Sequence, residues 1–424
     1  MNYPDSVHFL YALGNEIKTA KFGLERIRAL LAALGNPQDR LSIVHVAGTN
    51  GKGSTCAMIE AGSRAAGLRT GLYTSPHLAE PTERIRIAGR PVSAERFADA
   101  FNRVHAVVEQ LLSREAIDLH TTYFETVTAM AFLIFAEERV ERVVLEVGLG
   151  GRLDATNVVR PALAVIAPVD FDHEVYLGRA IESIAAEKAG ILKPGVPAVF
   201  ARQRPEAARV LDGRASELGI PVTRATDSLV EGLALDARGS SFELAGAAPL
   251  SIRCPLAGEH QVDNAVTAAL ALVRSGVDRR SIETGIGAAE WPGRLEHVRE
   301  RPAIVLDGAH NPAAARALAA YIARFYAGRR LHLIFGIMRD KAAAEIAGIL
   351  FPLAWRVIVT APKQSRALAP ETLRTVADHP NLQSAPTLEE ALRMVGNADA
   401  GDAVFITGSL FLVAEARALL LGNP

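Results

Sequence analysis

The sequence predicts an α/β protein with a mostly parallel sheet, helices on both faces of that sheet, and a second, smaller α/β region. Three observations support this fold class. Short apolar runs rich in β-branched residues alternate with helical patterns along most of the chain. A glycine-rich turn joins the strand at 43–48 to a helix, and a second strand–helix series starts after Trp291-Pro292-Gly293-Arg294. Because parallel strands need crossover connections, this alternation indicates helices that cover both faces of a sheet.

The composition predicts a two-domain globular protein in the cytoplasm. A chain of 424 residues is too long for one ordinary core, and its 49% hydrophobic and 22% charged residues are typical of globular proteins. A net charge of −1 excludes broad attraction to nucleic acid or to an anionic membrane. The two cysteines, Cys56 and Cys254, lack metal-like neighbours, which indicates reduced thiols. Neither a signal sequence nor an apolar run of about 18 residues is present, so we expect no membrane association.

The elements follow in order. Residues 1–40 are expected to be largely helical, with a Gly-Asn-Pro stop at 35–37. In the part that follows, we expect strands at 43–48, 70–74, 143–151 and 162–170 and helices from 54 onward and at 93–112, 122–138 and 182–192. Short apolar–polar runs at 222–255 predict a small antiparallel meander, a helix resumes at 258–276, and the second α/β series occupies the rest. We place the domain boundary near 293–299.

The stretch from Ile43 to Thr55 has the arrangement of a phosphate-binding loop. An apolar strand ends on Gly48, three glycines lie within six positions, and Lys52 and Ser54 come just before a helical pattern. Backbone N–H groups and a helix N-terminus favour an anion, and the lysine adds a point charge. The match to the common P-loop pattern is imperfect, because Gly53 separates Lys52 from Ser54. The alternative is a glycine-rich turn that binds nothing, and the position of the lysine argues against it.

Polar residues at other strand ends predict a shared site. Ser75, Glu146 and Asp172 each lie at or just beyond a predicted strand end, where open α/β sheets bind ligands. Glu146 lies in an apolar strand, so its carboxylate should be paired, metal-bound or protonated unless it points to water at an edge. The hydroxyls of Ser54 and Ser75 with Glu146 and His173 form a donor set in which oxygen dominates, which favours Mg²⁺ over zinc.

Two further stretches carry candidate residues. Lys188 lies among small apolar residues on a helix, and from the sequence alone an amphipathic lysine reaching solvent is the simpler interpretation. Asp307 and His310 lie on a turn between a strand and a helix, where they are candidates for substrate or nucleotide contacts. In the same turn, Asn311 is expected to be the N-cap and Pro312 the first helical residue.

Taken together, these stretches resemble the folylpolyglutamate synthase/dihydrofolate synthase family, a branch of the Mur ligase superfamily. The similarity spans essentially the whole chain, and the Gly51-Lys52-Gly53-Ser54 form of the loop is the one that this family uses. Its ordered segments are FGLERI (22–27), HVAGTNGKGS (45–54), YTSPHL (73–78), TYFETVTAMAF (122–132), EVGLGGRLDATN (146–157), DFDHEVYLG (170–178), IAAEKAGILKPG (184–195), GEHQVDNA (258–265), WPGRLE (291–296), DGAHNP (307–312) and GSLFLVAE (408–415).

The resemblance implies an ATP-binding Mur ligase domain over 1–295, a Rossmann-like glutamate ligase domain over 296–424, and an active site in the cleft between them. It implies one or two Mg²⁺ ions held by Ser54, Ser75, Glu146 and His173. It also implies a carbamate on Lys188, and a role for His310 with ATP or with glutamate. The residues that it assigns to ATP are Gly48, Thr49, Asn50, Gly51, Lys52, Gly53, Ser54, Asn264, Arg294 and Asp307. Those that it assigns to the pterin-acid pocket are Phe22, Gly23, Leu24, Glu25, Thr122, Tyr123, Phe124, Glu125, Leu153, Asp154 and Ala155.

The activity implied by the resemblance is ATP-dependent addition of L-glutamate to dihydropteroate and to folate glutamate tails. The acid would be activated as an acyl phosphate, because a carboxylate is a poor electrophile. A monomer is expected. Three alternatives stay open at this point: extension of folate tails alone, a cell-wall Mur ligase, and a nucleotide-driven switch that makes no bond. The GKGS loop argues against the cell-wall enzyme, and the second α/β region argues against the switch.

Overall fold

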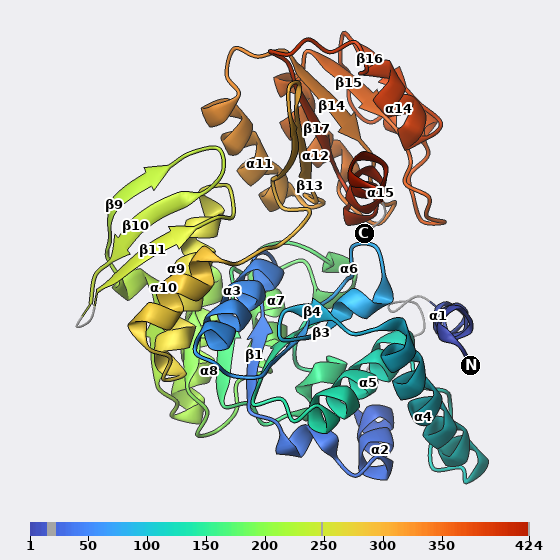
Figure 1. Ribbon diagram of the computed structural model, residues 1–424, viewed down its shortest axis with the longest axis vertical. Helices are drawn as coiled ribbons and strands as arrows, with labels where there is room; N and C mark the ends of the chain where they lie inside the picture. Colours follow the sequence, from blue (N-terminus) through green and yellow to red (C-terminus); the bar gives the residue numbers. More distant parts are fainter. Residues whose placement is uncertain (15–22, 247–248, 423–424) are drawn as a thin grey trace. The chain divides into compact units, whose positions relative to one another are not determined.

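The computed structural model describes residues 1–14, 23–246 and 249–422 (Figure 1). The chain divides into two compact units, and the sequence between about 230 and 290 passes back and forth between them. The first unit consists of Met1–Glu231, Glu243–Ile252 and Asp263–Ala289, and the second of Gly232–Phe242, Arg253–Val262 and Glu290–Pro424. The predicted division after residue 295 stays a prediction.

An eight-stranded sheet forms the centre of the first unit, with the order β4-β3-β2-β5-β1-β6-β7-β8. All its neighbouring pairs are parallel except β2–β3 and β3–β4, which confirms the predicted mostly parallel sheet. The strands are β1 (Ile43–Ala47), β2 (Thr70–Tyr73), β3 (Ile85–Ile87), β4 (Arg90–Pro91), β5 (Arg142–Glu146), β6 (Leu163–Ile166), β7 (Ala198–Phe200) and β8 (Val222–Arg224).

The strand order brings the predicted polar residues to one edge of this sheet. Strands β2, β5, β1 and β6 are consecutive neighbours and run in the same direction. Ser75 follows β2, Glu146 ends β5, Gly48 follows β1 and His173 follows β6. Since neighbouring strands lie about 4.8 Å apart, these four carboxyl ends present their residues side by side.

Helices cover this sheet, and several of them confirm the predicted ranges. Ser93 caps α4 and Thr122 caps α5, one residue before each helix begins. The α-helices of this part of the chain are α1 (Tyr3–Ala12), α2 (Glu25–Ala33), α3 (Lys52–Ala65), α4 (Ala94–Ser113), α5 (Tyr123–Glu137), α6 (Glu174–Leu177), α7 (Ile181–Ala189), α8 (Pro205–Leu218), α9 (His260–Arg274) and α10 (Arg279–Gly287). Short 3₁₀ turns lie at Pro37–Arg40, Pro81–Arg84, Ala155–Val158 and Ala225–Asp227.

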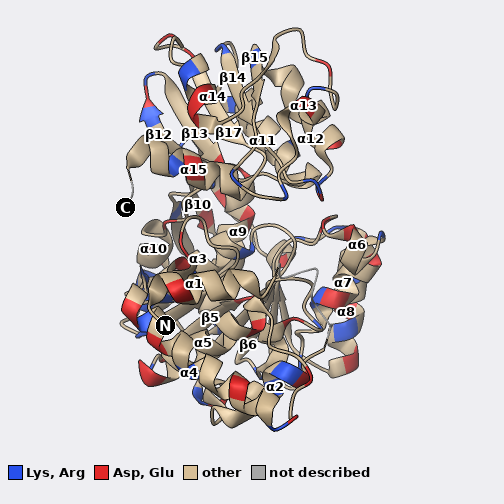
Figure 2. Cartoon of the chain, turned by 90° about the vertical axis from the view of Figure 1, so that its right-hand side faces the viewer, with Lys and Arg blue, Asp and Glu red and all other residues tan. Residues whose placement is uncertain are grey.

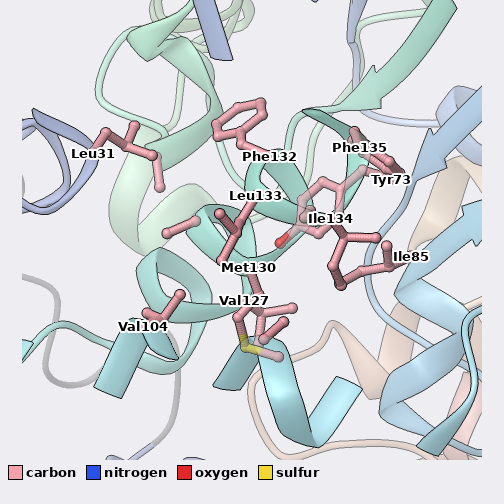
Figure 3. Packing of buried hydrophobic residues seen from close by; sticks show 14 of the residues in the cluster. Leu31, Tyr73, Ile85, Val104, Val127, Met130, Phe132, Leu133, Ile134 and Phe135 are labelled. Carbon is pink, nitrogen blue, oxygen red and sulfur yellow. The ribbon is translucent and has the colours of Figure 1, made fainter. Parts of the chain in front are cut away.

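The largest core of the first unit lies where α4 and α5 pack side by side. Helix α5 is apolar almost all round, and its side chains contact Tyr73 of β2, Ile85 of β3 and Val104 of α4 (Figure 3). A helix that is apolar on all faces is expected in a fully buried position. This core fixes the N-terminus of α5 beside the carboxyl ends of the neighbouring strands.

Helix α3, which follows the phosphate loop, packs against α10 through two glycines. A Cβ atom on Gly285 would lie 2.3 Å from Cα and 2.5 Å from N of Gly62. The two helix backbones therefore touch at this crossing (Figure 1). Any larger side chain here would push α3, and with it the phosphate loop, out of its position.

The small predicted meander is a three-stranded sheet with the order β11-β10-β9. Strands that follow one another in sequence are neighbours in the sheet. Its strands are β9 (Val230–Leu235), β10 (Ser240–Leu244) and β11 (Leu250–Cys254).

A six-stranded sheet forms the centre of the second unit, with the order β12-β13-β17-β14-β15-β16. All neighbouring pairs are parallel except β12–β13, an edge pair that the sequence did not indicate. The strands are β12 (Glu296–Glu300), β13 (Ala303–Asp307), β14 (Leu331–Phe335), β15 (Arg356–Val359), β16 (Leu382–Ser384) and β17 (Ala403–Thr407). The helices are α11 (Pro312–Phe325), α12 (Ala343–Leu350), α13 (Pro370–Leu373), α14 (Leu388–Met394) and α15 (Leu410–Leu421), with a 3₁₀ turn at Phe351–Leu353.

The surface carries charges of both signs. Figure 2 shows basic and acidic residues interspersed over the helices of both units, in line with the net charge of −1. Within the described ranges, no helix combines the length and the apolar composition that a membrane span requires.

Candidate active site at the carboxyl ends of four strands

The phosphate loop leads from β1 directly into α3. The helix begins at Lys52, two residues before the predicted start, so Lys52 and Ser54 both lie in its first turn. Gly51 is the N-cap and has a φ of +78°, a conformation that residues with a Cβ rarely adopt. A Cβ at this position would also lie 2.2 Å from Oδ1 of Asn264 on α9, so the Asn264 side chain lies directly against the loop.

The first half of the loop is fixed by the neighbouring strand connection. The backbone N–H groups of Thr49 and Asn50 donate to the carbonyl oxygen of Pro168 at 2.8 and 3.3 Å. The Thr49 hydroxyl donates to the carbonyl of Asp170 at 2.9 Å and accepts from the Asp170 N–H at 3.0 Å. The backbone donors that remain for an anion are therefore those of the first turn of α3, which have no carbonyl partner within the helix.

Two lysine side chains contact backbone carbonyls of this loop. The Lys52 ammonium donates to the carbonyl oxygen of Thr49 at 3.1 Å, and the Lys188 amine donates to that of Gly48 at 2.9 Å. Lys188 is buried, so the interpretation of this side chain as one that reaches solvent was wrong. Burial, together with the nearby Lys52 cation, lowers the pKa of the Lys188 amine to about 7. A large fraction of this amine is therefore uncharged at neutral pH.

Two members of the predicted metal set are in contact. The backbone N–H of Ser75 donates to Oε2 of Glu146 at 3.1 Å, and the Glu146 carboxylate is buried. Its burial removes the alternative of a strand-edge carboxylate in water. Ser54 is buried in the first turn of α3, one strand away.

The fourth member of the set lies beyond β6. His173 is half-buried and has a φ of +53°, and its N–H donates to Oδ1 of Asp172 at 2.8 Å. This backbone conformation is uncommon for a residue with a side chain. Hydroxyl, carboxylate and imidazole donors at adjacent strand ends fit a hard divalent cation.

A buried network next to the site contains His45, which was not among the residues predicted for the site. His45 in β1 is hydrogen-bonded through Nε2 to the Thr156 hydroxyl at 2.9 Å, and Thr156 donates to Oδ1 of Asp154. Burial lowers the pKa of His45 to about 3, so the imidazole is neutral. Asp154 also accepts from the N–H of Leu149 at 2.8 Å, which orders the glycine-rich segment after β5. The one sequence signal was a histidine within an apolar strand.

The N-terminus of α5 carries the residues predicted for the pterin-acid pocket. Thr122 and Glu125 form a reciprocal capping box. The Thr122 N–H donates to the Glu125 carboxylate with a nitrogen–oxygen distance of 2.8 Å, and the Glu125 N–H donates to the Thr122 hydroxyl at 3.2 Å. Glu125 also forms a buried ion pair with Arg26 of α2 at 3.3 Å. The side chains of Thr122 and Glu125 therefore stabilise the N-terminus of α5, independently of any role in binding a ligand.

The aromatic residues of this turn lie nearer the strand ends. Tyr123 stacks on Tyr11 with ring centroids 5.7 Å apart, and the Arg84 guanidinium lies 4.9 Å from the Tyr123 centroid. Phe124 packs against the backbone of Gly148, where a Cβ would lie 2.6 Å from Cζ of the ring.

The remaining pocket residues come from two other segments. Leu153, Asp154 and Ala155 lie at the 3₁₀ turn after β5, next to the network of His45. Gly23, Leu24 and Glu25 lie at the start of α2, whereas Phe22 lies outside the described residues.

The turn after β13 in the second unit is rigid. Asp307 accepts from the N–H groups of Leu295 and Ala309, both at 3.0 Å, and burial raises its pKa although Arg294 opposes the shift. Nδ1 of His310 lies 2.7 Å from the carbonyl of Gly308, and since a carbonyl only accepts, Nδ1 carries the proton.

The helix start that follows this turn was predicted correctly. Asn311 caps α11 by accepting from the N–H of Ala314 at 2.9 Å, and Pro312 is the first helical residue. A rigid turn at the carboxyl end of a parallel strand is a common ligand-binding position in α/β sheets.

Comparisons with known proteins agree with this architecture. Residues 46–272 match the Mur ligase middle domain, and residues 293–410 match the Mur ligase glutamate ligase domain. The chain is 35% identical over 408 residues to the dihydrofolate synthase/folylpolyglutamate synthase of Bacillus subtilis, with 94% of each chain covered.

Two solved structures are similar over almost the full length. The folylpolyglutamate synthase of Mycobacterium tuberculosis, complexed with ADP and AMPPCP, gives a TM-score of 0.92 at 34% identity and covers 100% of both chains. An Escherichia coli protein in complex with DHPP and ADP gives 0.89 at 31% identity, with 99% of this chain and 97% of that chain covered.

Proposed function

Because the chain belongs to the dihydrofolate synthase/folylpolyglutamate synthase family of Mur ligases, we propose that it makes both dihydrofolate and folate glutamate tails. It is an ATP-dependent ligase that joins an acid to an amino acid. The observation that carries the proposal is the set of four consecutive strand ends, which gathers a phosphate loop, two lysines and a buried carboxylate.

The reaction proposed for this site has two steps. An oxygen of the pteroate or folate carboxylate attacks the γ-phosphorus of ATP, the bond from that phosphorus to the bridging oxygen breaks, and ADP leaves. The amino group of L-glutamate then attacks the acyl carbon of the acyl phosphate, loses a proton, and inorganic phosphate leaves from the tetrahedral intermediate. Several negative charges converge during the first step, so fixed positive charge and N–H donors lower its barrier.

The chain's own residues would supply that stabilisation. The first-turn N–H groups of α3 would hold phosphate oxygens, and the Lys52 ammonium would leave the Thr49 carbonyl for the transferring phosphoryl group. Asn264, which lies against Gly51, would contact the nucleotide beside the loop. The assignments of Arg294, Asp307 and His310 to nucleotide or glutamate stay predictions.

The proposed metal is Mg²⁺, held by Ser54, Ser75, Glu146 and His173. Their oxygen-dominated donor set and their adjacent strand ends fit this ion, which would neutralise phosphate charge when bound. The Ser75 N–H donates to Oε2 of Glu146 and so helps to orient this carboxylate at the strand end.

We propose further that Lys188 carries a carbamate. Its buried amine has a pKa lowered to about 7 and can therefore attack CO₂, forming an N–C bond and releasing one proton. The modification replaces a cation with an anion beside the phosphate loop. Carbon-13-labelled CO₂ should give a carbamate signal in the NMR spectrum that increases from pH 6 to pH 8. The signal should be lost in Lys188→Gln, and an identical signal in that variant would contradict the assignment.

Glutamate incorporation with ATP and Mg²⁺ tests the overall function. Labelled L-glutamate is offered with 7,8-dihydropteroate in one reaction and with a reduced monoglutamyl folate in another. Incorporation into both acceptors is expected. Incorporation into folate alone would restrict the enzyme to tail extension, and ADP release without incorporation into either acceptor would refute the ligase assignment. A measurement of the oligomeric state of the same preparation would test the expected monomer. The cytoplasmic location stays a prediction.

A further inference from the structure

A cluster of three side chains in the first unit consists of residues other than the four proposed Mg²⁺ ligands. His105 and Glu109 lie one turn apart on the same face of α4, and His120 lies in the connection between α4 and α5. Oε1 of Glu109 is 3.9 Å from Nδ1 of His105 and 4.0 Å from Nε2 of His120. One ligand atom from each residue lies within 4.8 Å of the other two.

The two imidazoles present buried nitrogens without hydrogen-bond partners. Within the described ranges, Nδ1 of His105 and Nε2 of His120 are inaccessible to solvent and form no hydrogen bond. The other nitrogen of His120, Nδ1, lies 2.8 Å from the carbonyl oxygen of Thr121, so Nδ1 carries the proton and Nε2 keeps its lone pair. A backbone carbonyl that fixes the tautomer in this way is the usual support of a metal-ligating histidine.

Aromatic packing holds both rings in place. Phe9 of α1 lies 4.7 Å from the His105 ring and 5.6 Å from the His120 ring, centroid to centroid, and Phe101 stacks on His105 at 5.5 Å. Glu109 is 57% exposed, so its carboxylate can change rotamer without disturbing the core. The site thus has two fixed ligands and one adaptable ligand.

Charged groups of both signs lie around the cluster. Burial lowers the pKa of His105, and His120 and the Met1 amino group lower it further, whereas Glu109 opposes the shift. The Met1 amino group itself donates to Oδ1 of Asn102 on α4 at 2.7 Å. Among the three side chains of the cluster, Glu109 supplies the negative charge that offsets a bound cation.

The donor set and the distances select the kind of ion. Two imidazole nitrogens and one carboxylate oxygen form a common zinc set, whereas Mg²⁺ favours a set in which oxygen dominates, as at the strand ends. A tetrahedral ion with bonds of about 2.1 Å keeps its ligand atoms about 3.4 Å apart. The two distances from Glu109, 3.9 and 4.0 Å, exceed this value by about half an ångström, and all three ligand atoms lie within 4.8 Å of one another. The ligands would therefore close by about 1 Å around a bound ion.

We propose that His105, Glu109 and His120 form a second metal site, for Zn²⁺ or a similar first-row transition ion. The site is separate from the Mg²⁺ of the ligase reaction. An ion bound here links α4 to the connection that leads into α5, beside Phe9 of α1. It therefore stabilises the packing of α1, α4 and α5, and its fourth position is left to water.

The test measures Zn²⁺ binding by calorimetry and thermal unfolding on EDTA-treated full-length protein without nucleotide. Glu109→Gln is the main variant because an exposed, isosteric change leaves folding intact. Since the loss of a supporting hydrogen bond alone costs about 10–100-fold in metal affinity, loss of the ligand should weaken this Zn²⁺ site by at least about 100-fold. His120→Gln should weaken Zn²⁺ binding by a similar factor. The control variant His8→Gln, which changes an exposed histidine of α1, should bind Zn²⁺ with the affinity of the wild type.

Further controls separate the two metal sites. His173→Gln should retain the Zn²⁺ site of the α4 cluster, and Glu109→Gln should retain ligase activity with Mg²⁺ within about twofold. Binding of Co²⁺ should give visible absorption bands of a tetrahedral complex in the wild type and in His173→Gln, but not in Glu109→Gln. The proposal would be overturned if the wild type and Glu109→Gln bound Zn²⁺ with equal affinity and showed an equal rise in Tm. It would also be overturned if the wild-type protein bound no ion except at the site of His173.

Discussion

The contact between α3 and α10 makes a quantitative prediction for Gly285→Ala. A Cβ at this position would lie 2.3 Å from Cα of Gly62 and 2.6 Å from the backbone carbon of Ala61. Ordinary contact distances start near 3.4 Å, so the helices must separate by about 1 Å, and backbone atoms cannot rotate aside as a side chain would. Overpacking typically costs about 1–3 kcal/mol, and this contact should lie at the upper end.

The helix propensity of alanine offsets part of this cost. Gly to Ala in a helix interior gains about 1 kcal/mol, so the net loss expected for Gly285→Ala is about 2 kcal/mol. Gly213 in α8 provides the matched control, because a Cβ there would meet nothing within 4 Å. With a change in Tm of about 2–4 °C per kcal/mol, Gly285→Ala should lower Tm by about 4–8 °C, and Gly213→Ala should raise it by about 2–4 °C.

The same substitution should affect catalysis, because α3 begins at Lys52. A displacement of about 1 Å at a reacting group can cost up to about 100-fold in rate, so kcat/KM for ATP should decrease by about 10–100-fold in Gly285→Ala and remain unchanged in Gly213→Ala. Thermal unfolding and ADP release measure the two effects. A Gly285→Ala variant as stable as Gly213→Ala would refute the claim that the two backbones touch.

Three further predictions concern the site and its surroundings. Lys52→Ala should reduce kcat by at least about 100-fold with an unchanged circular dichroism spectrum, and near-normal turnover would remove the phosphate-loop assignment. Glu146→Gln keeps the acceptor for the Ser75 N–H but should raise the Mg²⁺ concentration for half-maximal activity by at least about tenfold, which a Mg²⁺ titration measures. The pKa of His45 is about 3 in the folded protein and near 6.5 when unfolded, so the unfolded state binds more protons between these values, and stability is lost as the pH falls below about 6.5. At pH 5 the burial of His45 should lower the free energy of unfolding by about 2 kcal/mol. The free energy of unfolding of His45→Gln, measured with urea, should therefore depend less steeply on pH than that of the wild type. Equal pH dependence in the two proteins would mean that His45 does not contribute.

The sequence was sufficient to predict the central strands of the large sheet and many residues of the candidate site. Buried parallel strands consist of nearly continuous apolar runs, and the carboxyl ends of such strands lie at one edge, so Ser75 and Glu146 could be placed together before any contact was known. The caps of α4, α5 and α11 were also predictable, because capping depends on local sequence alone.

Features that depend on tertiary contacts could not be predicted in this way. Strands β3 and β4 have only three and two residues, and β12 is an edge strand of mostly polar residues, so apolar periodicity is weak in all three. Lys188 has the local sequence of an exposed helical lysine, and only the packing of α7 against the phosphate loop buries it. The partner of His45, Thr156, lies 111 residues further along the chain, and the third member of the His105 cluster, His120, lies on another segment. The sequence alone does not show that these residues meet.

The strand order has a consequence for how the protein folds during synthesis. Strand β1 is buried along its whole length, yet its two neighbours, β5 and β6, begin only at Arg142 and Leu163. An apolar strand with both edges unpaired therefore persists while the ribosome makes the intervening helices, and such edges promote aggregation. The proposed ATP site cannot be complete until the chain has passed Asn264, so nucleotide would protect the completed unit but not the nascent one. Chaperones that hold extended apolar segments should therefore contact this chain early, over the stretch that later becomes the phosphate loop.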